Sequence, residues 1–259
     1  VKNIENLGLI GNINKANSLC SGDYIVFSAG DDLSDPDRVA RTIREFSGQD
    51  TLLVCSDVEF IDERGARLPR PSHLAPLFHQ RFTIYEAAQS MSLYIGATGA
   101  ISKKLIDAFP PLSVHGCYED LAFGFRAALL GRVKFVDEPL VKYRYNIGIS
   151  AQAASPPDTA SLVTQKLHVI DVNICCLQQR RLDIEHVAAD SELLEFVTKR
   201  LKALEKKRQG LADVKYSFKQ PIRFMARSFW EFSRVRRALR WRRRAKRSLA
   251  DGSGSDCSA

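Results

Sequence analysis

Two rhythms of hydrophobic and polar positions alternate along the first part of the chain. Short apolar runs such as residues 24–28 and 133–136 stand between turn residues, as strands buried on both faces of a sheet do. Between them, apolar residues recur three and four positions apart, which predicts helices such as 120–130, ended by Gly131. Residues 51–61 predict a further pair of strands. Strands and helices in alternation predict an α/β fold, with a sheet flanked by helices.

The pattern changes after residue 150. A polar, proline-containing stretch predicts a linker at 151–158, and two helical patterns follow at 162–177 and 191–204. The last helical pattern, at about 218–249, has one apolar stripe and carries many arginines elsewhere. We therefore expect four parts: an α/β domain over 1–150, a helical extension over 151–213, a basic amphipathic helix over 214–250 and a disordered tail over 251–259.

The composition excludes several classes of protein. Of the 259 residues, 45% are hydrophobic and 26% are charged, which is typical of a folded globular protein and not of a disordered chain. No apolar run approaches the roughly 20 residues that a membrane-spanning helix needs. The 6 cysteines show no paired spacing and no companion histidines. A disulfide framework or a zinc site is therefore not expected, and a reducing cytoplasm is the favoured compartment.

The net charge of +8 is concentrated near the carboxyl end. Residues 214–247 carry 13 Lys and Arg against one acid, whereas residues 1–213 carry 25 against 27. A basic helix with Trp230 and Trp241 among its apolar residues is typical of peripheral binding to an anionic membrane. The alternative is an apolar stripe packed on the α/β domain, with a solvated basic face. A nucleic-acid role is not expected, because no nucleic-acid motif accompanies the charge.

A pair of acids, Asp31 and Asp32, follows the predicted strand 24–28. In open α/β sheets, the carboxyl ends of strands form the edge at which ligands bind. Adjacent carboxylates repel each other, and a divalent cation that they share with substrate phosphates relieves that repulsion. Alternatively, Asp32 or Asp35 caps the helix that is expected to begin near Pro36.

A second pair of acids, Glu119 and Asp120, stands at the start of the helix predicted at 120–130. Acids at a helix amino terminus stabilise the helix dipole, and this is the structural interpretation. The chemical interpretation is a general base, because a carboxylate at a loop–helix junction can reach a substrate hydroxyl.

These two pairs belong to an ordered series of motifs. The series comprises Asn6-x-Gly8, Asn14, residues 22–27 leading into Asp31-Asp32, Pro36, Ser56-Asp57, Ile61-Asp62, residues 96–99, residues 109–112, Glu119-Asp120, Gly131, residues 138–141, Tyr143-Arg144 and Ser150. In this order, residues 6–150 resemble the family 2 glycosyltransferases of the GT-A fold. The resemblance implies a Rossmann-like mixed sheet, and it places the first βα units and most of the nucleotide-binding part before residue 1.

The resemblance also implies roles for individual residues. Asp31 matches the last acid of the family's Asp-x-Asp motif, which touches the nucleotide and the metal, and Asp32 is the acid directly after it. Asp120 matches the catalytic base, with Glu119 beside it. The other residues that the resemblance implies in nucleotide-sugar binding are Asn14, Gly96, Thr98, Gly99 and Arg144. The implied cofactor is Mg²⁺ or Mn²⁺, held by Asp31 and Asp32, which would neutralise the leaving diphosphate.

Two departures from the family pattern bear on metal and phosphate binding. Ala29 stands where the motif has its first acid, so metal binding would rely on Asp31 and Asp32. Asn146 stands where a histidine often follows the Tyr-Arg pair, which removes a possible metal or phosphate ligand.

The expected function is therefore that of an inverting glycosyltransferase. It would move a sugar from a nucleotide-sugar donor to a saccharide or lipid-linked acceptor, in the synthesis of a cell-surface polysaccharide or lipopolysaccharide, at the inner face of the cytoplasmic membrane. The alternative is a non-catalytic, truncated or degenerate homologue that acts as a membrane-surface binding module. A phosphoryl-transferring enzyme is disfavoured, because the chain has no Gly-x-x-x-x-Gly-Lys-Ser/Thr loop.

Overall fold

The computed structural model describes residues 2–47, 50–71, 74–147, 159–188 and 190–218. The chain divides into two compact units, Val1–Gln209 and Gly210–Ala259, and each is described by itself. The predicted linker at 151–158 and nearly all of the predicted basic helix and tail lie outside the described residues. Of the second unit, the structure describes residues 210–218, which are the last residues of a helix.

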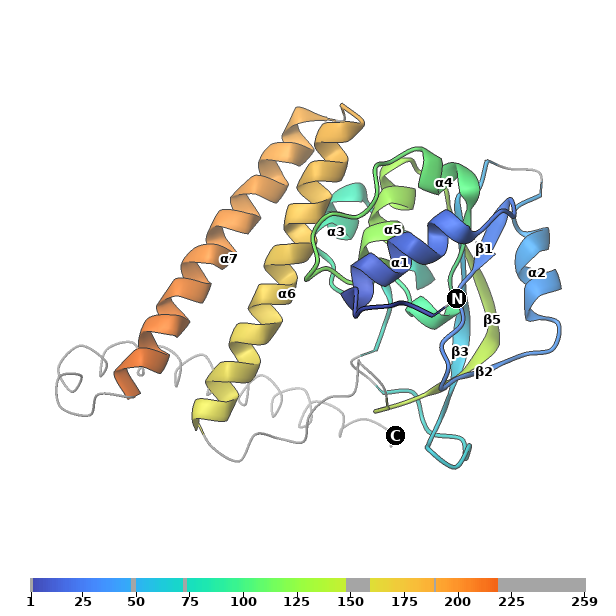
Figure 1. Ribbon diagram of the computed structural model, residues 1–259, viewed down its shortest axis with the longest axis horizontal. Helices are drawn as coiled ribbons and strands as arrows, with labels where there is room; N and C mark the ends of the chain where they lie inside the picture. The colour runs from blue at the N-terminus through green and yellow to red at the C-terminus, as the bar shows by residue number, and fades with distance from the viewer. Residues whose placement is uncertain (1, 48–49, 72–73, 148–158, 189, 219–259) are drawn as a thin grey trace, which may run out of the picture. The chain divides into compact units, whose positions relative to one another are not determined.

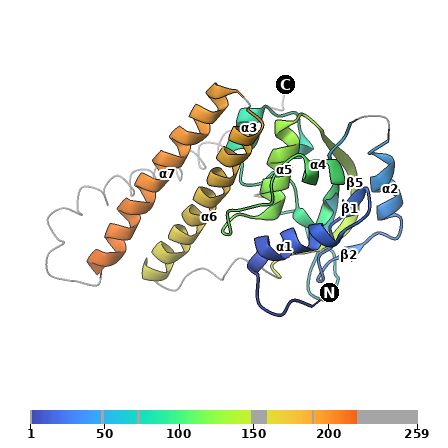
Figure 2. The same cartoon turned by 45° about the horizontal axis from the view of Figure 1, so that its top comes forward.

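A mixed sheet forms the centre of the first unit. Its strands are β1 (Tyr24–Val26), β2 (Leu33–Ser34), β3 (Leu53–Ile61), β4 (Ala100–Ser102) and β5 (Val133–Arg144), in the order β1-β4-β3-β5-β2. The long strands β3 and β5 pair in parallel, and the other pairs are antiparallel. Figures 1 and 2 show α2 (Arg38–Arg44) and α5 (Glu119–Leu129) on opposite faces of this sheet. The predicted α/β class, a mixed sheet flanked by helices, is confirmed.

Two details of the predicted strands are wrong. Residues 51–61 form one strand instead of two, because irregular pairing on both sides of Asp57 lets β3 continue beside β5. The strand predicted at 24–28 is shorter and is not buried on both faces. Among the described residues β1 pairs only with β4, so Ile25 is buried while Tyr24 is 39% exposed.

The remaining short elements surround the sheet. They are α1 (Gly8–Leu19), α3 (Ile84–Gln89), α4 (Lys103–Asp107) and the 3₁₀ turns η1 (Leu77–His79) and η2 (Gly96–Thr98). Helix α5 is buried along most of its length, from Leu121 to Ala128. It ends at Gly131, whose φ of 69° is the left-handed conformation that glycine adopts easily. The predicted helix at 120–130 and its stop are therefore confirmed.

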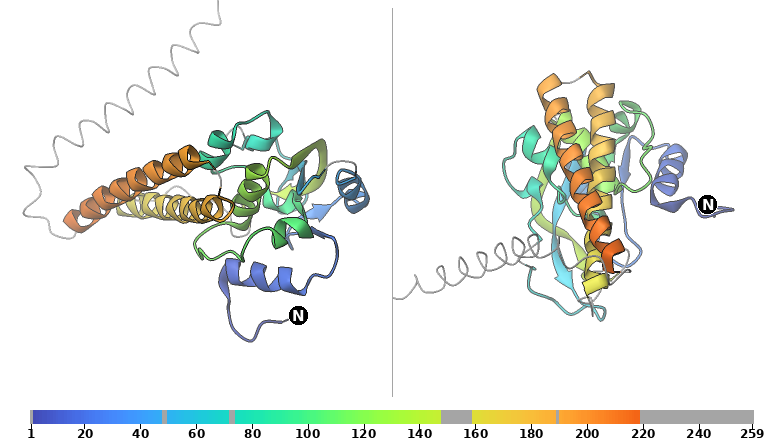
Figure 3. Two further views of the ribbon diagram at one scale, coloured as in Figure 1. Left: turned by 90° about the horizontal axis from the view of Figure 1, so that it is seen from above. Right: turned by 90° about the vertical axis from the view of Figure 1, so that its left-hand side faces the viewer.

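Two long helices follow, α6 (Thr159–His186) and α7 (Ser191–Phe218). They run side by side in Figures 1 and 3, and an ion pair between Asp171 and Arg208 joins them. Helix α6 packs against α5, and Phe196 of α7 contacts Tyr85 of α3 with 5.3 Å between the ring centroids. The helical part predicted to follow the sheet is confirmed. None of the helices within the described residues combines the length and the apolar character needed to cross a membrane.

Candidate active site

The first acidic pair lies in the loop between β1 and β2. The Oδ1 of Asp32 accepts a hydrogen bond of 2.7 Å from the backbone N–H of Arg144, at the end of β5. Its Oδ2 is buried and has no hydrogen-bond partner among the described residues. Burial raises the pKa of Asp32, and the neighbouring charge of Asp31 raises it further, against the lowering effect of the Arg144 bond. An opposite charge beside Oδ2 would favour the ionised form of Asp32 and so lower its pKa.

Asp32 does not cap α2. Its carboxylate is bonded to Arg144, and the N-cap residue of α2 is Asp37, which makes no capping bond with its side chain. Asp35 accepts a 2.9 Å bond from the Asp37 N–H and so shapes the turn ahead of the helix. The capping interpretation therefore does not account for Asp31 and Asp32.

Arg38, the first residue of α2, is a member of this site that the sequence did not reveal. Its side chain is buried, with 2% of the residue exposed. The guanidinium donates bonds of 2.6 Å to the carbonyl oxygens of both Phe27 and Ala97, and a bond of 2.9 Å to the Ser34 hydroxyl. Arg38 thus ties the end of β1 to η2 while its charge lies near Asp32. In the sequence it looks like any arginine on an exposed helix.

The second acidic pair begins α5. The Oδ1 of Asp120 accepts a 2.7 Å bond from the Leu121 N–H. Burial, followed by the adjacent charge of Glu119, raises the pKa of Asp120 to about 7. Burial also raises the pKa of Glu119. A carboxyl group whose pKa lies near neutral pH has the proton affinity of an effective general base.

Three predicted binding residues, Gly96, Thr98 and Gly99, form or adjoin η2. A Cβ on Gly96 would lie 3.2 Å from the Asp120 Cβ and 3.4 Å from Glu119 Oε1, so a side chain here would crowd both acids. A Cβ on Gly99 would lie 2.7 Å from the Tyr94 ring. The Thr98 hydroxyl is buried and donates a 2.8 Å bond to the Ile95 carbonyl. Gly96 therefore meets the acids directly, while Thr98 and Gly99 fix the shape of the turn.

The turn η2 also connects the two acidic pairs. The Phe27 N–H donates a 2.9 Å bond to the Gly99 carbonyl, and Arg38 bonds to Ala97. At the other side of the turn, Gly96 packs on Asp120. A continuous set of contacts therefore runs from the end of β1, ahead of the Asp31-Asp32 loop, to the candidate base.

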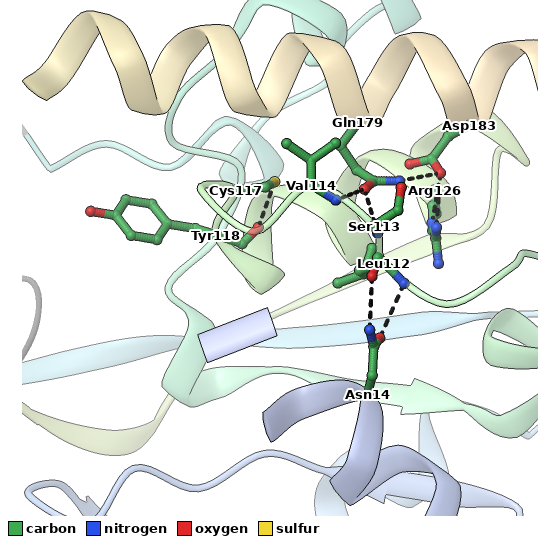
Figure 4. A network of polar contacts seen from close by, with 9 residues as sticks. All are labelled: Asn14, Leu112, Ser113, Val114, Cys117, Tyr118, Arg126, Gln179 and Asp183. Atoms are coloured by element: carbon green, nitrogen blue, oxygen red, sulfur yellow. Dashed lines mark hydrogen bonds and ion pairs between the residues drawn. The ribbon is translucent and has the colours of Figure 1, made fainter. Parts of the chain in front are cut away.

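The structure shows the polar groups of Arg144 and Asn14 bonded to main chain. Arg144 donates through Nε to the carbonyl of Asp31 at 2.7 Å, and through NH1 to the carbonyls of Asp62 and Glu63 at 2.9 and 2.6 Å. Figure 4 shows Asn14 reaching from α1 to Leu112, where its amide donates at 2.7 Å and accepts at 3.1 Å. Their predicted contact with the nucleotide-sugar remains a prediction, and the observed bonds show that both residues hold loops.

The chemistry of Asp31 and Asp32 fits a hard divalent cation. Both are half-buried carboxylates, and Oδ2 of Asp32 is an acceptor that lacks a donor among the described residues. Within the described part of the chain, no group of three or more His, Cys, Asp or Glu side chains could enclose a metal. Such a cation would therefore need further ligands from water and from substrate phosphates, as Mg²⁺ commonly does.

Comparison with known proteins bears on the identity of this site. Residues 1–129 match the model of a family described as Glycosyl transferase family 2. No curated relative matches the sequence. Among solved structures, S. aureus TarS 1–349 in complex with UDP-GlcNAc is similar, with a TM-score of 0.43 and 15% identity, over 82% of this chain and 72% of that chain. The family model spans both the Asp31-Asp32 and the Glu119-Asp120 pairs and confirms the resemblance found in the sequence. The chain therefore carries a glycosyl transferase family 2 domain over residues 1–129.

Proposed function

We propose that this glycosyltransferase inverts the configuration of the transferred sugar and that Asp120 is its general base. The observation that carries the proposal is that a Cβ on Gly96 would meet Asp120 and Glu119, so these acids face a turn without side-chain bulk. The Oδ1 of Asp120 is held by the Leu121 N–H, and Oδ2 is the oxygen available for a proton.

In the proposed reaction, Asp120 takes the proton of an acceptor hydroxyl. The hydroxyl oxygen bonds to the anomeric carbon of the donor sugar as the bond from that carbon to the nucleoside diphosphate breaks. The proton remains on Asp120, and the electron pair of the broken bond leaves with the diphosphate. Mg²⁺ or Mn²⁺ on Asp31 and Asp32 would neutralise the charge of that leaving group. Because attack and departure occur on opposite faces, the configuration inverts.

Calorimetry and transfer assays test this assignment together. We expect one of UDP, GDP or dTDP to bind in the presence of Mn²⁺, and the Asp120→Asn variant to bind it equally well. The same variant should lose transfer by about 10²- to 10⁴-fold, the usual contribution of a general base. Near-normal turnover of Asp120→Asn would refute the assignment. Nucleotide binding without any transfer by the unaltered protein would favour the alternative of a non-catalytic binding module.

The acceptor and the location of the enzyme belong to the same proposal. The 13 Lys and Arg against one acid in residues 214–247 suit an anionic membrane surface, where each basic residue contributes about 1 kcal/mol. We propose attachment to the inner face of the cytoplasmic membrane, with a saccharide or lipid-linked acceptor of cell-surface polysaccharide or lipopolysaccharide synthesis.

Flotation with liposomes tests the membrane attachment. The full chain should float with vesicles that contain about one-third phosphatidylglycerol and should remain in the lower fraction with phosphatidylcholine alone. A chain that ends at residue 213 is the comparison and should not float with either. Equal recovery of both chains with anionic vesicles would exclude the basic segment as the anchor.

A further inference from the structure

One face of α6 is polar but buried. Gln179, Arg180 and Asp183 are 2%, 1% and 1% exposed, respectively. Burial of an amide and two charged groups costs free energy unless each group finds partners. These three residues find partners on three different segments of the catalytic unit.

Gln179 holds the loop that leads into the acids of α5. Its Oε1 accepts bonds of 3.1 and 3.2 Å from the backbone N–H groups of Ser113 and Val114. Its Nε2 donates a 3.0 Å bond to Asp183. Figure 4 shows Gln179 above this loop and Asn14 below it, so the loop is held from both sides.

Asp183 extends the connection to α5 itself. Its Oδ1 accepts bonds of 3.0 and 2.9 Å from Nε and NH2 of Arg126, and both residues are buried. Arg126 lies on α5, the helix whose first turn carries Glu119 and Asp120. The α6 helix therefore fixes both the loop before the base and the helix that bears it.

Arg180 anchors the segment that leads from α3 towards η2. Its guanidinium donates bonds of 3.1 Å to the Ala88 carbonyl and 2.7 Å to the Ser90 carbonyl. It also lies over the Phe125 ring, 5.4 Å from the centroid. Burial lowers the pKa of Arg180, and the nearby thiols and acids, Asp120 among them, act in the opposite direction.

The groups that act on Asp120 come from several elements. They are Glu119 beside it on α5, Cys176 and Arg180 on α6, Tyr94 before η2, and Cys117 and Tyr118 in the preceding loop. Among these groups, all of them within the described residues, Arg180 is the cation. Substitution of Arg180 by a neutral residue therefore removes the positive charge that favours the ionised form of Asp120.

We propose that Gln179 and Arg180 of α6 are positioning residues of the active site. Gln179 fixes the loop that leads into Asp120, and Arg180 fixes the segment ahead of η2 and sets the charge around Asp120. The proposal rests on the proposed function, since it takes Asp120 as the base. It assigns to helix α6 a part in catalysis that Gln179 and Arg180 perform through other residues, without touching substrate.

The first test reads the titration of Asp120 and needs no substrate. The protein is labelled with ¹³C at the aspartate carboxyls, and the Asp120 signal is assigned by its loss in Asp120→Asn. We expect Arg180→Gln to raise the midpoint of Asp120, and Arg180→Lys, which keeps the charge, to raise it less. Arg181→Gln is the matched control, because Arg181 is a neighbouring arginine whose side chain is 41% exposed beside Glu185.

The second test measures the rate of sugar transfer. Gln179→Leu should lower kcat by about tenfold or more through misplacement of the base, with the affinity for nucleoside diphosphate and Mn²⁺ unchanged. Arg180→Gln should move the acid limb of the pH–rate profile upward, whereas a purely structural defect lowers the rate equally at every pH. Circular dichroism identifies any variant that fails to fold, and Arg180→Lys then replaces Arg180→Gln.

The outcomes separate the two proposals. Equal Asp120 midpoints in Arg180→Gln and Arg181→Gln would overturn the role of Arg180, and an unchanged kcat in Gln179→Leu would overturn that of Gln179. If the unaltered protein transfers no sugar, the proposed function fails, while the carboxyl titration still decides whether Arg180 sets the charge around Asp120.

Discussion

Replacement of Asp120 by Asn should stabilise the protein at alkaline pH while it removes the proposed base. The substitution keeps an oxygen that can accept the bond from the Leu121 N–H, which is 2.7 Å long in the structure. It removes a carboxylate that burial and the charge of Glu119 disfavour. The same groups that raise the proton affinity of Asp120 therefore make its ionised form costly to the fold.

The magnitude follows from linkage. The pKa of Asp120 rises from 3.8 to about 7 on folding, so the folded protein binds more protons than the unfolded chain between these values. The stability that protonated Asp120 contributes is present in full below the unfolded pKa and is lost as pH rises through the folded one. Each unit of difference corresponds to about 1.36 kcal/mol. Between about pH 5 and pH 8, the unaltered protein should thus lose about 3 kcal/mol that Asp120→Asn keeps.

Urea denaturation of both proteins at the two pH values measures this difference. The pH dependence of groups that do not interact with Asp120 cancels to a first approximation when the variant is compared with the unaltered protein at each pH. In thermal denaturation, the midpoint temperature of the variant relative to that of the unaltered protein should change by roughly 6–12 °C between the two pH values. Asp23→Asn is the control, because Asp23 is an exposed acid that undergoes the same chemical change. A difference that is the same at both pH values, or one of opposite sign, would refute the reasoning.

Three further predictions concern other parts of the site. Asp32→Asn keeps the acceptor for the Arg144 N–H but loses the charge at the buried Oδ2. Calorimetry should therefore show that Mn²⁺-dependent nucleotide binding weakens at least tenfold. The control variant Asp35→Asn should bind the nucleotide normally. Arg38→Met leaves the Phe27 and Ala97 carbonyls without their donor and should lower the free energy of unfolding by about 3–5 kcal/mol. Arg44 is exposed, so the control variant Arg44→Met should change the free energy of unfolding little. The thiols of Cys117 and Cys176 are buried and lie 3.6 Å apart, so prolonged treatment with diamide should join them in a disulfide, which peptide mass spectrometry detects as a loss of two hydrogens. The same loss in Cys176→Ser would contradict the observed approach of α6 to the loop.

The parts of the fold that were predicted correctly are those that local sequence determines. Helix α5 was expected at 120–130 and spans Glu119–Leu129, because its apolar stripe and its glycine stop are both local signals. The continuity of β3 was missed, because polar Ser56 and Asp57 resemble a break between two strands. Only the pairing with β5, about 80 residues away in sequence, shows that the strand continues past them.

The candidate site divides along the same line. The acids and Gly96 could be found from their order in the sequence, and the structure brings Gly96 against Glu119 and Asp120. The buried polar residues could not be found, because Arg38 and Gln179 have their partners in distant segments and stand in helices rich in other polar residues. Their signal is burial, which appears only once the chain is folded.

The place of Ala29 in this site can be judged from the contacts of its neighbours. The motif's first acid is missing, and the group that orients Asp32 in this structure lies at the end of β5. The Arg144 N–H holds the carboxylate of Asp32, while the Arg144 guanidinium holds the backbone carbonyl of Asp31, so one residue bonds to both positions. A two-carboxylate site whose backbone is fixed in this way does not need a third acid to orient it. On the proposed function, the loss of the first acid therefore removes one ligand or nucleotide contact but leaves the remaining two carboxylates in place, and the Asp32→Asn measurement tests whether they are sufficient.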